Sequence, residues 1–197
     1  MHKNPRNKLS RRSFLASSLR AALFGTYALN SNARTQTPWS NWSGGLSCNP
    51  KGRYDIASEN QLIDLLRETS GPIRPVGSGH SFSPLVPTDG HLIVIDQLSG
   101  VFDHDGQSLQ ATVGAGTRLG DLGAPLFEIG QGMLNLPDID RQTVAGATAT
   151  GTHGTGINFK SLSGYITGLR IITASGEVKD IDASHGDLFD AARVNLG

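Results

Sequence analysis

Cysteine and long apolar runs are scarce in this sequence, and each absence excludes a class of protein. The 197 residues include one cysteine, Cys48, which excludes an intrachain disulfide framework and a cysteine-rich zinc or iron–sulfur site. No apolar run reaches the roughly 18 residues of a membrane span, so we expect no stable span. We also expect no metal centre. A chain of this length can bury one good core, or two small subdomains that share one.

Net charge is also absent, but the balance of 17 basic and 17 acidic residues is uneven along the chain. Residues 1–34 carry seven of the basic side chains and none of the acidic ones. The remainder therefore has ten basic and 17 acidic side chains, a net charge of −7. An acidic body argues against nucleic-acid binding, which needs clustered Lys and Arg to displace counterions.

The first 34 residues have the composition of an export signal. A basic start containing Arg11 and Arg12 precedes a weakly apolar stretch, 16–29, and then small residues at 30–33. The arginine pair resembles the twin-arginine (Tat) signal of bacteria, and Arg20 inside the apolar stretch disfavours other export routes. We therefore expect a periplasmic or otherwise exported protein that uses the Tat machinery. A disordered basic tail or a short amphipathic helix is the alternative.

The body mixes strand and helix patterns without a strict β-α-β rhythm, which predicts an α+β fold. After an irregular segment, 35–53, we expect one domain over 54–197. Ser58 predicts the N-cap of a first helix, and Ser175-Gly176 predicts the turn of a hairpin. The predicted strands are 73–76, 92–95, 108–113, 166–174 and 177–181, and the predicted helices are 58–70, 117–129 and 187–193. Pro125 weakens the prediction of one continuous helix over 117–129.

A first glycine-rich turn, Gly77 to Ser81, has a histidine, His80, at its apex. It does not fit the dinucleotide fingerprint, because Phe82 stands where a third glycine is needed and Pro84 prevents a helix from following. The turn can still point backbone N–H groups at an anion. A tight turn with a surface histidine is the alternative.

A second loop, Thr143 to Gly156, is rich in small residues. Its part from Gly146 to Gly156 has four glycines, four threonines and no charged residue. Such a backbone can approach a ligand closely, and threonine hydroxyls can hydrogen-bond phosphate oxygens. Together the two loops would suit a long ligand with a diphosphate in its middle. A glycine-rich barrel corner is the alternative for this loop.

Several separated segments of the sequence together resemble those of a known family. The segment 74–83 resembles the covalent-flavin loop of the aldonolactone and alditol oxidases, which belong to the vanillyl-alcohol-oxidase/PCMH-type flavoprotein superfamily. Leu136-Pro137 with 143–156 is similar to the second flavin loop of that family. Residues 41–44 and 173–177 are similar to its N-terminal motif and its hairpin. The resemblance covers about Trp42 to Gly197.

The resemblance implies a PCMH-type FAD-binding domain in which two α+β subdomains clasp FAD. His80 would carry the flavin through its 8α-methyl group. The residues implied around the diphosphate are Gly77, Ser78, Gly79 and Ser81. The residues implied on the other side of the cofactor are Ala147, Thr150, Gly151, Thr152 and His153.

The implied activity is FAD-dependent oxidation of a CH–OH group in a sugar lactone or polyol, with oxygen or another electron acceptor. The family continues beyond the stretch that ends here, into a further strand and a C-terminal substrate or cap domain. We therefore expect the domain to be incomplete and none of these residues to be catalytic. A non-catalytic FAD-binding fragment or truncated gene product is one alternative. An NAD-dependent Rossmann oxidoreductase is another, which Phe82 disfavours. The sequence leaves the oligomeric state open.

Overall fold

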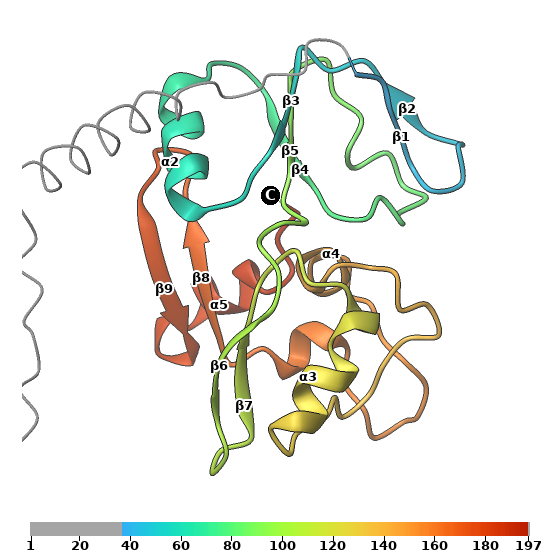
Figure 1. Cartoon of the computed structure of the whole chain (residues 1–197), viewed down its shortest axis with the longest axis vertical. Helices are drawn as coiled ribbons and strands as arrows, with labels where there is room; N and C mark the ends of the chain where they lie inside the picture. The colour runs from blue at the N-terminus through green and yellow to red at the C-terminus, as the bar shows by residue number, and fades with distance from the viewer. Residues whose placement is uncertain (1–36, 197) are drawn as a thin grey trace, which may run out of the picture. The chain divides into compact units, whose positions relative to one another are not determined.

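The computed structural model describes residues 37–196, which form an α+β arrangement of short strands and helices (Figure 1). The predicted signal segment, 1–34, lies outside the described residues. The strands are β1 (Trp39–Ser40), β2 (Ser47–Cys48), β3 (Gly52–Asp55), β4 (Ile73–Val76), β5 (His91–Val94), β6 (Val101–Asp105), β7 (Gln110–Val113), β8 (Gly168–Ile172) and β9 (Val178–Asp182). The α-helices are α2 (Glu59–Glu68), α3 (Gly123–Glu128), α4 (Val144–Ala149) and α5 (Asp187–Ala192), and the 3-10 helices are η1 (Leu119–Asp121), η2 (Leu162–Tyr165) and η3 (Ala183–His185). No helix within 37–196 is long and apolar enough to cross a membrane.

A three-stranded parallel sheet has the order β3-β5-β4, with β5 in the centre. The side chains of Leu92, Ile93 and Val94 in β5 are all buried. A central strand that is covered on both faces needs apolar side chains on both faces, and the continuous apolar run indicated this. Pro75 lies in β4, an edge strand of this sheet, where its missing N–H costs no ladder hydrogen bond.

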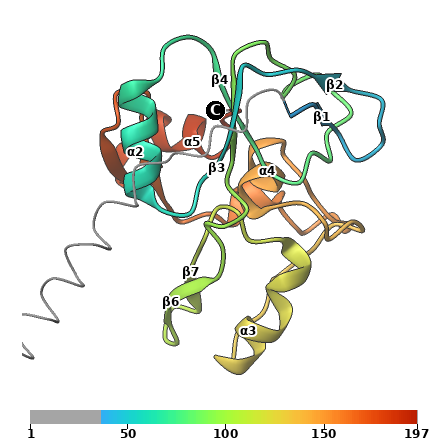
Figure 2. The same ribbon diagram turned by 45° about the horizontal axis from the view of Figure 1, so that its top comes forward.

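The two faces of the parallel sheet pack against different elements (Figure 2). Ile93 shares a buried cluster with Leu65 of α2. Leu92 and Val94, which point to the opposite face, share a cluster with Trp39 of β1. The sheet therefore lies between α2 and the β1–β2 hairpin.

Helix α2 begins where the sequence predicted. Ser58 is the N-cap, and its hydroxyl accepts a hydrogen bond from the backbone N–H of Gln61 at 3.2 Å. The helix ends at Glu68, close to the predicted boundary before Gly71 and Pro72. Its single fully buried residue, Leu65, belongs to the predicted apolar face.

Segment 35–53 was predicted to be irregular, and its described part differs from that prediction. Strands β1 and β2 pair antiparallel, with Trp39 opposite Cys48. Gly44 has a φ of +72° in the connecting turn, which glycine adopts without strain. Strand β3 also begins inside this segment, at Gly52. The strands of this hairpin have two residues each, too few for an alternating pattern to be seen in the sequence.

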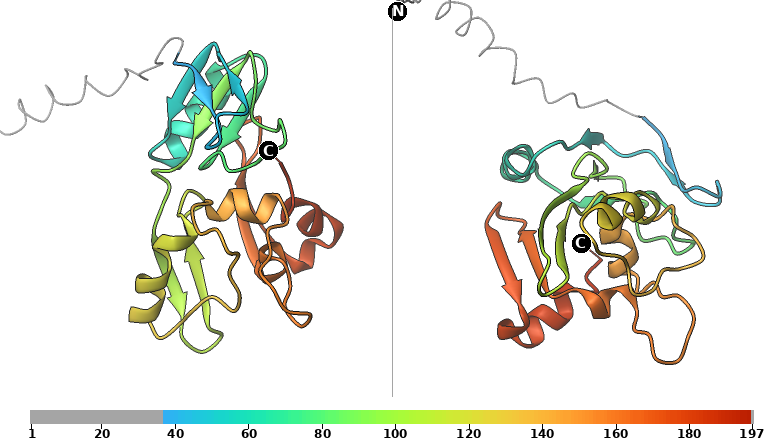
Figure 3. Two further views of the ribbon diagram at one scale, coloured as in Figure 1. Left: turned by 90° about the vertical axis from the view of Figure 1, so that its right-hand side faces the viewer. Right: turned by 60° about the horizontal axis from the view of Figure 1, so that its bottom comes forward.

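A second group of elements surrounds another core, formed by helices η1, α3, α4 and η2 (Figure 3). The hairpin of β6 and β7 lies along this core. Strand β7 begins at Gln110, two residues later than the start of the predicted strand 108–113, and ends at the same residue. The buried members of this core are Leu119, Leu122, Leu126, Ala147 and Leu162.

The predicted single helix over 117–129 is wrong, because the structure divides it into η1 and α3. Thr117 is not its cap. Its buried hydroxyl accepts a hydrogen bond from the N–H of Gly100 at 2.9 Å and donates one to the carbonyl of Gly114 at 2.7 Å. Pro125 falls in the first turn of α3, where a missing N–H is tolerated.

The C-terminal hairpin and helix agree with the sequence. Strands β8 and β9 pair antiparallel around a turn at Ser175-Gly176. Gly176 has a φ of +77°, and a Cβ there would lie 3.2 Å from Cγ2 of Ile63. The turn therefore packs against α2. Helix α5 follows, and its Phe189 is buried.

Two glycines allow the chain to pass close to the segment that follows β5. A Cβ on Gly114 would lie 2.3 Å from the carbonyl oxygen of Leu98, and one on Gly116 would lie 1.9 Å from that of Ile95. The N–H of Gly116 also donates to Leu98 at 2.9 Å. No side chain fits at either position, so the approach of these two backbone segments requires glycine.

Candidate functional site

The first glycine loop follows β4 directly and packs closely on two neighbours. A Cβ on Gly77 would lie 2.1 Å from Oγ1 of Thr143. Gly79 has a φ of +67°, and a Cβ there would lie 3.2 Å from Cζ2 of Trp39. The sequence predicted a turn that can point backbone N–H groups at an anion. The structure shows that both glycines are required for contact with the protein itself.

The β1–β2 hairpin holds this loop on either side of His80. The backbone N–H of Trp42 donates to the carbonyl of Gly79 at 3.1 Å. Nδ2 of Asn41, a side chain that is 3% exposed, donates to the carbonyl of Ser81 at 3.1 Å. Oδ1 of Asn41 accepts from the N–H of Leu46, so the asparagine is itself fixed within the hairpin.

His80 is half-buried and lies against an aromatic ring. Its imidazole stacks on Trp42, with 5.1 Å between ring centroids and 15° between planes. Phe82, which is 73% exposed, meets the same indole edge-on at 5.6 Å. Within residues 37–196, neither ring nitrogen of His80 makes a hydrogen bond. Both nitrogens are therefore free to react or to bind.

The backbone around His80 has unused donors. In the described part of the chain, the N–H groups of Ser78, Gly79, His80 and Ser81 donate no hydrogen bond. Four consecutive free N–H groups in a loop with little side-chain bulk can bind an anion. This agrees with the use that the sequence predicted for the turn.

The second glycine loop is partly helical, which corrects the prediction of a loop throughout 143–156. Thr143 caps helix α4 by accepting a hydrogen bond from the N–H of Gly146 at 3.2 Å. Threonine hydroxyls inside and after α4 donate back to its carbonyls, Thr148 to Val144 at 3.0 Å and Thr150 to Gly146 at 2.8 Å. Glycine and threonine are weak helix formers, so the composition concealed the helix.

Helix α4 ends in a Schellman motif. The N–H of Thr152 donates to the carbonyl of Ala147 at 2.9 Å, and that of Gly151 donates to Thr148 at 3.2 Å. Gly151 has a φ of +66°, and a Cβ there would meet no atom within 4 Å. Glycine is thus required here by backbone conformation, and the space above it is open.

The remaining predicted residues of this loop have different surroundings. Ala147 is 0% exposed and belongs to the core, so its side chain positions α4 and does not face solvent. Oγ1 of Thr152 accepts from Nε2 of Gln142 at 3.0 Å. His153 is exposed, and its Nδ1 lies 2.8 Å from the carbonyl oxygen of Gly154. Because a carbonyl only accepts, Nδ1 is the donor in this contact.

Thr143 connects the two loops. It is 1% exposed, contacts Gly77 of the first loop, and begins the helix that leads to the second. It also pairs with Arg118 in an isolated antiparallel bridge. The structure therefore brings the start of the first loop and the start of the second to one point.

Shifted pKa values lie outside both loops. The hydrogen bond from Arg170 lowers the pKa of Asp180, with which Arg170 makes two contacts, at 2.7 and 2.9 Å. Hydrogen bonds from Ser184 lower the pKa of Asp182.

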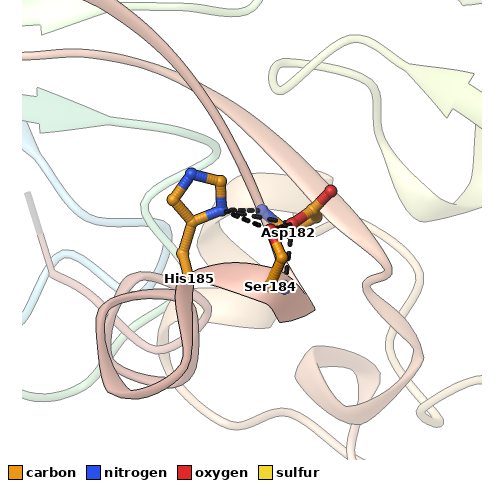
Figure 4. Close-up of polar contacts among 3 residues, drawn as sticks. All are labelled: Asp182, Ser184 and His185. Carbon is orange, nitrogen blue, oxygen red and sulfur yellow. Dashed lines mark hydrogen bonds and ion pairs between the residues drawn. The ribbon is translucent and has the colours of Figure 1, made fainter.

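Asp182, Ser184 and His185 gather at the start of η3 and have the composition of a hydrolytic triad (Figure 4). Their arrangement is different. The backbone N–H of Ser184 donates to Oδ1 of Asp182 at 2.9 Å, and the backbone N–H of Asp182 donates to Nδ1 of His185 at 3.2 Å. These contacts form a capping box for a short helix, so the cluster is structural.

An open cavity of about 270 Å³ lies outside both loops. Its lining residues come from β6 and from the end of α3: Val101, Phe102, Asp103, His104, Pro125, Glu128 and Ile129. None of the predicted site residues lines it. The two loops are therefore not part of this cavity.

Comparison with known proteins identifies the family to which both loops belong. Residues 50–182, which include both loops, match the family described as FAD binding domain. The chain belongs to this family of PCMH-type FAD-binding domains, and the sequence-based identification of the family is confirmed.

Curated relatives and solved structures match this chain over part of their length. It is 43% identical over 162 residues to the L-gulono-1,4-lactone dehydrogenase of Mycobacterium tuberculosis, covering 81% of this chain and 37% of that protein. It is 35% identical over 174 residues to the D-arabinono-1,4-lactone oxidase of Kluyveromyces lactis, covering 84% and 33%. The fold matches xylooligosaccharide oxidase from Myceliophthora thermophila C1 with a TM-score of 0.69 at 23% identity, covering 78% and 34%. The chain spans about a third of the length of these proteins.

Replacing Gly151 tests the Schellman cap. Gly151→Ala should lower the free energy of unfolding by about 1 kcal/mol, because alanine is strained at a φ of +66° although its methyl group has space. Gly151→Asn is the matched control and should cost less, since asparagine tolerates this conformation. Urea unfolding measures both. Equal stability of the two variants would contradict a backbone role for Gly151.

Proposed function

We propose that this chain is the FAD-binding part of a flavoenzyme that oxidises a CH–OH group of a sugar lactone or polyol. The family match over both loops supports the cofactor. The names of the relatives, a lactone dehydrogenase and a lactone oxidase, support the substrate class. When bound, FAD would accept two electrons from the substrate carbon, and the chain would supply binding and orientation.

The single observation that carries the cofactor assignment is the run of free backbone donors from Ser78 to Ser81. A diphosphate is an anion with several acceptor oxygens, and neutral N–H groups can bind it without a charged side chain. Gly77, Ser78, Gly79 and Ser81 would surround this diphosphate. Their small side chains leave the backbone accessible.

The second loop would contact the other side of the cofactor. The space above Gly151 is open, and the neighbouring Thr150, Thr152 and His153 are at least partly exposed. The hydroxyl proton of Thr150 is already donated to Gly146, so Thr150 would offer oxygen lone pairs. Ala147, being buried, would act by fixing α4 in the core.

His80 would carry the flavin covalently. Attachment would join one imidazole nitrogen to the carbon of the flavin 8α-methyl group. It would break the N–H bond and one methyl C–H bond, release two protons and leave two electrons on the flavin, which oxygen or another acceptor would then remove. The two unbonded ring nitrogens of His80 support this assignment.

A non-catalytic FAD-binding fragment is the second candidate. The chain covers about a third of each matched relative, so the names of the relatives describe the activity of longer proteins. Both candidates require FAD binding, and they differ in whether this part belongs to a flavoenzyme that oxidises a substrate.

Reconstitution with FAD tests the proposal. We expect the chain to retain FAD through gel filtration, with flavin absorbance at about 450 nm, because the donors of the first loop are free. Adding sugar lactones or polyols under anaerobic conditions should not bleach this absorbance, since we expect no catalytic residue in this chain. Bleaching would show that these residues suffice for oxidation, and failure to retain FAD would contradict the proposal.

Replacing His80 tests the covalent link. In the wild-type chain the flavin should remain on the protein after acid precipitation, whereas His80→Ala should release it completely. His104→Ala, an exposed histidine outside both loops, is the control and should keep its flavin. Acid-resistant flavin on His80→Ala would assign the link to another residue.

We further propose export by the Tat route after the cofactor is inserted, which would make the export machinery a partner. The supporting residues, Arg11 and Arg12, lie outside the described residues. The Tat carrier moves folded proteins, and a domain whose core is completed by a cofactor needs such a route.

The export proposal predicts that the double variant Arg11→Lys with Arg12→Lys, fused to a reporter that is active only after folded export, loses its periplasmic signal. The control Arg6→Lys makes the same charge-conserving change at a residue outside the arginine pair and should export normally. Flavin content measured in the cytoplasm shows whether the variants fold. Undiminished periplasmic signal from the double variant would refute the Tat assignment.

A further inference from the structure

We propose that Trp42 is a positioning residue for His80, and that it fixes the orientation of the imidazole by stacking. This inference rests on the proposed function, in which His80 carries the flavin. The observation behind it is the parallel contact of the two rings, 5.1 Å apart with 15° between their planes.

The imidazole nitrogen that bonds the flavin cannot be held in a hydrogen bond, so a contact through the ring face is a suitable way to orient the ring. Stacking restrains the plane of the imidazole and leaves both nitrogens at its edge free. Within residues 37–196, Trp42 provides the only contact of this kind to His80, whose nitrogens have no hydrogen-bond partner. The stacking contact therefore restrains the plane of the His80 ring without occupying either nitrogen.

Trp42 can act in this way because it is held in place itself. Its backbone N–H donates to the residue before His80, Gly79, and its neighbour Asn41 donates to the residue after it, Ser81. Phe82 packs edge-on against the indole. Two hydrogen bonds thus fix the backbone on both sides of His80, and the indole fixes its side chain.

An exposed tryptophan is otherwise difficult to explain at this position. Trp42 is 57% exposed, whereas Trp39 of the same hairpin is buried and contributes to the sheet core. The indole of Trp42 is thus placed outside the buried cluster that stabilises the hairpin, and its ring contacts are with His80 and Phe82.

The orientation of His80 is tested first on the full chain without FAD. The indole ring current should shift the His80 ring-proton resonances upfield, and these resonances are assigned by their loss in His80→Ala. Trp42→Leu, which keeps apolar bulk without a π face, should remove the shift, and Trp42→Phe should retain part of it. Unchanged His80 resonances in Trp42→Leu would overturn the proposal.

The consequence for attachment is measured by adding FAD to the apo chain and following acid-resistant flavin over time. Trp42→Leu should attach flavin roughly three- to tenfold more slowly than wild type, the range expected for loss of one aromatic pair, and Trp42→Phe should recover most of the rate. Reversible FAD binding, measured separately, should change little. Phe102→Leu, an exposed aromatic residue of β6, is the matched control and should behave as wild type.

The outcomes separate the two proposals. If the wild-type chain binds FAD but never forms acid-resistant flavin, the covalent assignment fails, and the ring-proton shifts alone decide whether Trp42 orients His80. If the wild type attaches flavin and Trp42→Leu attaches it at the same rate, the positioning role fails while the covalent assignment stands. Equal urea midpoints for wild type and Trp42→Leu exclude unfolding as the cause of a slower rate.

Discussion

The close contact between Gly77 and Thr143 is the constraint on which the candidate site depends. A Cβ on Gly77 would lie 2.1 Å from the Thr143 hydroxyl oxygen, so only glycine allows the end of β4 to reach this point. The same hydroxyl caps α4. One buried atom thus links the parallel sheet, the first glycine loop and the helix that leads to the second loop, and any residue larger than glycine at 77 would separate them.

Sequence patterns predicted the elements whose signals are local. Ser58 indicated the start of α2, the apolar run 92–95 indicated a central buried strand, and Ser175-Gly176 indicated a hairpin, all as the structure has them. Helix α4 was missed because its residues are small and weakly helix-forming, and its end is defined by the positive φ of Gly151. Thr117 was misassigned as a cap because its hydroxyl bonds Gly114, before the predicted helix, and Gly100, 17 residues away.

In the candidate site, too, local features could be predicted from the sequence and long-range contacts could not. Its residue types were evident from the sequence, and the family match confirms the predicted family, which implies FAD as the cofactor. The reason for each glycine was not evident, because contact with protein and contact with a ligand leave the same composition. Gly77 and Gly79 pack on Thr143 and Trp39, whereas Gly151 faces open space. The hydrogen bonds from Asn41 and Trp42 to the His80 loop were also not predicted, because they join residues about 40 positions apart.

These long-range contacts have a consequence for the order of folding. The His80 loop is shaped by a hydrogen bond between residues 40 positions apart in the chain and by a contact with Thr143, much further along. Closing such loops costs chain entropy before the contacts are gained, and local elements such as α2 form without this cost. The surface around His80 therefore takes shape only when these distant segments have come together. A chain in which they are still apart would lack the shaped loop, so cofactor uptake would depend on contacts that local secondary structure alone does not provide.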